Sequence, residues 1–129
     1  MTTKHATTNL DDVKDLAPGF GMGEMGEARF ARNDLGAESI GLANYRMNPG
    51  QRVGFGHCHE QVEEIYVVLS GSGRFKLDDE IIDVGPKDVV FCPPSVMREW
   101  ESGPDGMDLL AFGGHAENDG DMTKDWWTD

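Results

Sequence analysis

The sequence predicts an all-β fold, either a sandwich or a small barrel. From about residue 38 onward, short runs rich in strand-forming residues alternate with turn signals. No run of helical length or period interrupts them, and about eight strands at this spacing favour a closed or two-layered β architecture over an open parallel sheet. We therefore predict a single domain over residues 1–129, with its core at about 38–113, an N-terminal flank at 1–37 and a C-terminal tail at 114–129.

Turn-forming residues divide the predicted core into its strands. The turn signals are 48–50 (Asn-Pro-Gly), 71–73 (Gly-Ser-Gly), 78–79 (Asp-Asp), 85–86 (Gly-Pro), 93–94 (Pro-Pro) and 103–104 (Gly-Pro). The strands predicted between them are 39–47, 52–59, 63–70, 74–77, 80–84, 88–92, 96–101 and 107–112. In the third of these, alternate positions are apolar on both faces, with Tyr66 and Val68 on one face and Ile65, Val67 and Leu69 on the other. This pattern predicts a strand in the centre of the fold.

The two flanks carry weaker signals. Residues 10–16 could form a short helix capped by Asn9, and the Pro18-Gly19 pair would end it. The acidic C-terminal tail contains Trp126 and Trp127, and two adjacent tryptophans favour a terminus held against the body of the domain. A role in stacking on a ligand or in an interface is the alternative. We predict that both flanks pack outside the barrel.

Composition excludes several classes of partner. The chain has 24 acidic and 11 basic residues, a net charge of −13, which disfavours binding to nucleic acid or to anionic membranes. With 38% hydrophobic and 27% charged residues the chain should fold. It contains no apolar run long enough to span a membrane and no apolar leader in its first nine residues, so we expect a cytoplasmic protein. Cys58 and Cys92 are expected to be free thiols inside strands.

The segment GFGHCHEQVEEIYVVLSGSG carries the strongest chemical signal. His57 and His59 alternate with Cys58, so a strand directs both imidazoles to one face and the thiol to the other. Glu64 begins the next predicted strand. Two imidazoles and a carboxylate suit Fe, Mn, Ni, Zn or Cu and leave coordination positions open for a ligand. A hydrogen-bonded pair of half-buried histidines is the alternative interpretation.

The spacing of these residues resembles the first motif of the cupin superfamily. His57, one residue, His59, four residues, Glu64, six residues and Gly71 reproduce that motif. The run KDVVFCPPSVMREWES, residues 87–102, resembles the second motif. The resemblance implies a double-stranded β-helix, also called a cupin or jelly-roll barrel. It also implies a metal site in the barrel and an activity within a wide range, from dioxygenases and isomerases to sugar binders and storage proteins.

The second motif departs from the cupin pattern at the position of its ligand. Arg98 stands where the fourth metal ligand, a histidine, is usual, and Lys87, Ser95 and Ser102 also differ from the pattern. Arginine has no free lone pair and remains protonated, so it cannot ligate a cation. Two arrangements remain open. Arg98 could anchor an anionic ligand beside a metal held by the other three residues, or it could pair with Glu64 and leave the pocket without metal.

Strand alternation predicts the other residues of the cavity. Tyr66 shares a face with Glu64, and Trp100 shares one with Arg98, so both should line the interior together with Met97, although barrel packing alone would also explain them. His115 could reach the mouth of the pocket or lie in an exposed loop. We expect a cupin that binds a small polar or anionic metabolite, with enzymatic turnover left open, and that forms a homodimer. An interaction or storage role with an inert pocket is a third possibility.

Overall fold

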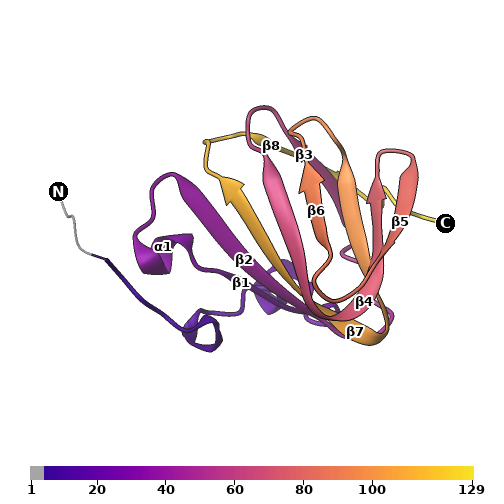
Figure 1. Cartoon of the computed structure of the whole chain (residues 1–129), viewed down its shortest axis with the longest axis horizontal. Helices are drawn as coiled ribbons and strands as arrows, with labels where there is room; N and C mark the ends of the chain where they lie inside the picture. Colours follow the sequence, from indigo (N-terminus) through magenta and orange to yellow (C-terminus); the bar gives the residue numbers. More distant parts are fainter. Residues whose placement is uncertain (1–4) are drawn as a thin grey trace.

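A computed structural model describes residues 5–129 and confirms the all-β prediction. Its strands belong to one hydrogen-bonded sheet that curls around an interior (Figure 1). Short helical turns lie at η1 (Leu10–Asp12), η2 (Pro18–Phe20) and α1 (Arg32–Leu35). The strands are β1 (Gly26–Phe30), β2 (Ile40–Met47), β3 (Phe55–His59), β4 (Glu64–Leu77), β5 (Glu80–Val84), β6 (Val89–Cys92), β7 (Arg98–Gly114) and β8 (Gly120–Lys124).

Two long antiparallel strands, β4 and β7, organise the fold. They pair from Glu64 opposite Gly113 to Leu77 opposite Arg98. β4 joins two predicted strands, because the glycine-rich stretch at 71–73 forms a bulge and not a turn. Gly71 has φ of 76°, and a Cβ there would lie 2.2 Å from the carbonyl oxygen of Gly106, so only glycine fits. The Gly-Pro turn predicted at 103–104 likewise lies inside the continuous strand β7.

The remaining strands attach to this pair. β5 and β6 pair with β4, β2 pairs with β7, and β1 extends the sheet beyond β2. β3 joins β7 through His57 opposite Arg98, and β8 pairs along the whole of β3. β1 and β8 lie in the two flanks and were not predicted as strands. Every residue of β8 is exposed, so it has none of the apolar alternation by which a strand is recognised.

The core is built around inward-facing side chains of β2, β4 and β7, to which β1, β5, β6 and the segment before β1 add further buried residues. Tyr66, Phe75 and Trp100 are almost completely buried, and their ring centroids lie 5.0–5.5 Å apart. The opposite face of β4 is apolar as predicted but partly open, with Ile65 42% and Leu69 47% exposed. The interior beneath the aromatic side chains is therefore well packed, and the functional groups lie where β3, β4 and β7 meet.

The flanks do not simply pack outside the barrel as predicted, because each contributes a strand, β1 or β8, to its sheet. Asn9 accepts a hydrogen bond from the backbone of Asp11, but the cap starts only one 3-10 turn, because Val13 is already extended with ψ of 134°. In the tail, Trp127 is 3% exposed and lies under the guanidinium of Arg52, 4.1 Å from the ring centroid. Within residues 5–129, no helix is long and apolar enough to cross a membrane.

Candidate metal centre and cavity

The start of β4 and one face of β3 bring the three predicted ligands together. His57 and His59 alternate along β3 and point to the same side, as strand geometry requires. Glu64 is the first residue of β4. The candidate ligand atoms of the three residues all lie within 4.8 Å of one another. Among residues 5–129 they are the group of histidine, cysteine and acidic side chains that could hold a metal ion.

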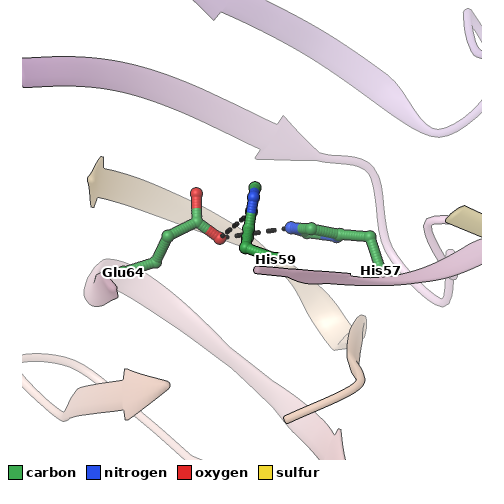
Figure 2. Close-up of side chains that lie close together, drawn as sticks. All are labelled: His57, His59 and Glu64. Carbon is green, nitrogen blue, oxygen red and sulfur yellow. Dashed lines mark hydrogen bonds and ion pairs between the residues drawn. The ribbon is translucent and has the colours of Figure 1, made fainter. Parts of the chain in front are cut away.

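One oxygen of Glu64 is the meeting point of the cluster. The Nε2 atoms of His57 and His59 each lie 3.2 Å from Oε1 of Glu64 (Figure 2). Tyr66 donates its hydroxyl proton to the same oxygen at 2.5 Å. Figure 2 shows the second carboxylate oxygen directed away from both imidazoles. The cluster therefore combines two imidazole nitrogens with a carboxylate. One carboxylate oxygen contacts both imidazoles and Tyr66, and the other is directed away from the imidazoles (Figure 2).

Arg98 also binds this oxygen. Its Nη1 lies 2.9 Å from Oε1 of Glu64, and its Nη2 donates to the carbonyl oxygen of Pro93 at 2.8 Å. The Arg98 side chain is completely buried. A buried guanidinium is retained only when it is paired, so the ion pair with Glu64 explains how the interior tolerates it. The fourth-ligand position of the cupin pattern is thus filled by a cation that is bound to one of the remaining ligands.

The surroundings keep Glu64 ionised. Burial alone would raise the pKa of its carboxyl, but the hydrogen bonds from His57 and Tyr66 and the charges of both imidazoles outweigh burial and lower the pKa to about 2. Burial and the neighbouring carboxylate raise the pKa of Tyr66 well above its ordinary value, so its phenol stays protonated and remains a donor. The cluster is therefore built around a carboxylate anion.

Asp119 supports the cluster from behind, and sequence reasoning missed it. It lies just before β8, is 7% exposed, and accepts backbone hydrogen bonds from Glu60, Gln61 and Val62 in the turn between β3 and β4. Its Oδ2 lies 3.2 Å from Nδ1 of His59. This contact is within ion-pair distance but not in hydrogen-bond geometry, so Asp119 acts on His59 through its negative charge. No local sequence pattern identifies Asp119, because its partners are almost sixty positions earlier in the chain.

The cluster opens into a cavity of about 230 Å³. Tyr66 and Trp100 are among its lining residues, and so is His115, which is exposed. Arg98 and Met97 are not among its lining residues, so the structure does not place them against a bound ligand. The lining residues are Phe30, Arg32, Asn33, Gly41, Leu42, Ala43, Tyr45, His57, Glu64, Tyr66, Trp100, Ala111, Gly113, Gly114 and His115.

The residues present fit a divalent transition metal. Nε2 of His59 is buried and makes no hydrogen bond within the described chain, although it is directed at Glu64. A buried imidazole nitrogen without a hydrogen-bond partner beside an ionised carboxylate is a suitable ligand pair for such an ion. Arg98 opposes the fit electrostatically, because its positive charge already neutralises the carboxylate that the metal would share.

Comparison with known families agrees with this site. A family model described as "Cupin domain" matches residues 43–106, the stretch that contains all three candidate ligands and Arg98. The chain belongs to the cupin superfamily. The expected double-stranded β-helix is thereby confirmed, together with the architecture of its solved relatives. No curated protein matches the chain by sequence.

Several solved cupins have the same fold. A cupin protein from Bacteroides fragilis is 21% identical with a TM-score of 0.72, over 92% of this chain and 89% of that one. Oxalate decarboxylase from Bacillus subtilis is 23% identical with a TM-score of 0.72, and the match covers 92% of this chain but only 33% of the decarboxylase. A putative sugar phosphate isomerase from Acidithiobacillus ferrooxidans is 22% identical with a TM-score of 0.64, over 78% of this chain and 66% of that one. At these identities the likeness establishes the fold alone.

Proposed function

We propose that this cupin binds a small polar or anionic metabolite at a divalent transition metal held by His57, His59 and Glu64. The convergence of two imidazole nitrogens on one carboxylate oxygen, each at 3.2 Å, carries the proposal. His57 and Glu64 also line the cavity, so an ion held there would face a bound ligand. Fe, Mn, Ni, Zn and Cu all accept this donor set.

The side chains around the ion would have separate tasks. A bound divalent metal supplies a Lewis acid that polarises a ligand oxygen. Tyr66 holds its proton on the hydroxyl and orients Glu64 through a hydrogen bond at 2.5 Å. Trp100 and Tyr45 close the inner end of the cavity with apolar surface and exclude water from it. Arg98 neutralises the charge of Glu64 through their ion pair.

Elemental analysis of the purified protein tests the proposal directly. The protein is prepared without chelator or nickel resin, and we expect about one equivalent of transition metal per chain. His57→Ala and His59→Ala should each remove the metal while the circular dichroism spectrum stays that of a folded β protein. Cys58→Ala is a matched control on the same strand, since this thiol points away from the site. Stoichiometric metal in both histidine variants would disprove the ligand set.

A metal-free binding module is the second candidate function. The 2.9 Å ion pair between Arg98 and Glu64 favours it, because the pair satisfies the carboxylate without any ion. In that case the purified protein contains no metal and chelator leaves its melting temperature unchanged. Small polar metabolites would still raise the melting temperature, because a ligand that binds only the folded state stabilises it. An inert pocket with a storage or interaction role would show neither metal nor ligand stabilisation.

A further inference from the structure

The charge of the cavity differs from that of the chain. The chain carries a net charge of −13, yet Glu64 is the single acidic residue among the cavity's lining residues, and Arg98 neutralises it. Arg32 is the one lining residue with a permanent positive charge. His115 also lines the cavity and can donate a hydrogen bond to a ligand. The cavity of this acidic protein is therefore locally positive.

Arg32 is placed to bind an anion. It begins α1, the short turn that follows β1, and it is half-buried. Its Nη1 donates to the carbonyl oxygen of Ala37 at 3.1 Å, which fixes the direction of the guanidinium. Within residues 5–129 Arg32 has no carboxylate within ion-pair distance. A braced guanidinium with free N–H groups suits the planar, two-pronged geometry of a carboxylate.

The lining residues also show which end of the cavity is open. Tyr66 and Trp100 are almost completely buried and form its inner end. Glu64 pairs with Gly113, two residues before His115, so it lies on the side of the cavity nearer the exposed residues Asn33 and His115. His57, Glu64 and Arg32 all line this one cavity. A volume of about 230 Å³ is below the range of roughly 300–1,000 Å³ that drug-sized ligands occupy, so the ligand must be smaller.

We propose that the ligand is a small dicarboxylate, or a carboxylate with a second oxygen-bearing end, in which one carboxylate binds Arg32 while the other end faces the metal cluster. This inference rests on the proposed function, because that other end is assigned to the metal. It moves the role of anion anchor, predicted for Arg98, to a residue that lines the cavity. Arg32 then selects ligands by charge and length.

Titration calorimetry on the metal-loaded protein tests the role of Arg32. The probes are malonate, succinate and glutarate, each compared with its half-amide, which keeps one carboxylate and loses the charge of the other. We expect one dicarboxylate to bind at least about tenfold more tightly than its half-amide. Arg32→Gln should weaken that dicarboxylate by about 10- to 100-fold and remove the preference, while Arg32→Lys restores part of it. The metal content should not change.

Arg46→Gln is the matched control, because Arg46 is half-exposed on β2 and forms only long surface ion pairs away from the cavity. It should bind every probe as the wild type does. Equal dicarboxylate affinities in the wild type and Arg32→Gln, or no binding of any dicarboxylate, would overturn the inference. A wild type that contains no metal, but whose dicarboxylate binding is still lost in Arg32→Gln, would overturn the proposed function and support the role of Arg32.

Discussion

At the scale of single residues, the buried ion pair between Arg98 and Glu64 determines the chemistry of the candidate metal centre. The Arg98 side chain has no exposed surface, and the Glu64 side chain is only 18% exposed. Replacing a buried pair by apolar residues is often neutral, but removing one partner leaves an uncompensated charge and costs about 3–5 kcal/mol. A metal ion can supply the missing positive charge. A metal ion bound by Glu64 would therefore compete with the ion pair for one carboxylate.

Arg98→His tests this competition. The substitution removes the opposing charge and adds the imidazole that is usual at this cupin position, so divalent metal should bind about tenfold or more tightly than in the parent. Without metal, the variant should unfold at lower temperature, because Glu64 has lost its partner. Calorimetric titration with metal measures the first effect, and thermal unfolding with and without chelator measures the second. Unchanged metal affinity would show that Arg98 does not influence the site.

The absence of a side chain at Gly113 leaves room for the side chain of Glu64. A Cβ at this position would lie 3.0 Å from Cγ of Glu64 and 3.3 Å from its Oε2, so Gly113→Ala should displace the carboxylate and weaken metal binding. Gly114→Ala is the control at the adjacent position, where the nearest atoms would be 3.8 Å and 4.0 Å away. Elemental analysis and metal titration of the two variants measure the difference. Equal metal affinity in both would mean that Glu64 does not ligate the metal.

Asp119 is a candidate positioning residue for His59, and it also holds the turn between β3 and β4. Asp119→Asn keeps Oδ1 as the acceptor for Glu60 and Gln61, but it replaces Oδ2, which accepts from Val62 and lies beside His59. Loss of such a partner behind a ligand histidine typically lowers metal affinity about 10- to 100-fold. We expect this loss together with a fall in melting temperature, because the buried N–H of Val62 loses its acceptor. A large fall in melting temperature with unchanged metal affinity would assign Asp119 to folding alone.

At the scale of elements, the C-terminal tail is held on the barrel by charge and by aromatic packing. Glu101 on β7 accepts hydrogen bonds from Arg52 and Arg74, and both guanidinium groups lie over the ring of Trp127. Trp127→Ala should lower the free energy of unfolding by about 3–5 kcal/mol, the usual cost for a buried tryptophan. Phe20→Ala is the control, because Phe20 is 67% exposed. Urea denaturation measures both, and equal stability would contradict a structural role for the tail.

The same cluster gives the fold a dependence on pH. Burial alone would raise the pKa of Glu101, but the bonds from Arg52 and Arg74 outweigh it and hold the pKa below its ordinary value of 4.5. A lowered carboxyl pKa stabilises the fold above the ordinary value, and this contribution is lost as the pH falls through the folded-state pKa. Glu101→Gln should therefore be less stable than the wild type at pH 7 and converge with it as the pH falls through the lowered pKa of Glu101. Parallel stability curves across this range would refute the prediction.

The elements of the core could be predicted because their alternation and turn residues agree. The start of β4 is an example, since Tyr66 and Val68 face inward and Glu64 precedes them. The sequence could not show that β4 is one long strand with a bulge, because Gly71 fits a turn and a bulge equally well. β8 was not predicted, because its strand conformation depends on pairing with β3 and not on an apolar alternation of its own residues. Local sequence cannot encode a pairing that tertiary structure supplies.

At the scale of the whole molecule, the candidate site contains residues that local sequence predicts and residues that only tertiary contacts bring to it. His57, His59 and Glu64 lie within eight residues, so strand period and spacing place them together. Asp119 and Arg32 reach the site from the two flanks, through contacts that span many positions of the chain. The sequence therefore predicts the candidate metal ligands, but only the folded chain shows which residues surround them.

The outer face of the sheet has an apolar patch over β4 and β6, formed by Ile65, Leu69, Val89 and Phe91. Their exposed fractions are 42%, 47%, 61% and 52%. Ile65 lies between Phe91 of β6 on one side and Phe112 of β7 on the other, so the patch is continuous across β4. None of these positions carries a charge, although the chain has a net charge of −13. We propose that a second copy of the chain covers this patch, because two identical uncharged faces can pack about a twofold axis without charge repulsion.

This proposal predicts a homodimer that one charged substitution disrupts. Sedimentation velocity should give a dimer for the wild type, whereas Val89→Asp should give a monomer, because the dimer would bury two unpaired carboxylates. Met122→Asp is the matched control, since Met122 is 63% exposed on β8 and lies outside the patch. It should remain dimeric. Because Val89 is already exposed in one chain, its replacement should leave the circular dichroism spectrum unchanged, which separates loss of the dimer from loss of the fold. A wild type that stays monomeric at high concentration would refute the dimer, and a dimeric Val89→Asp would place the interface elsewhere.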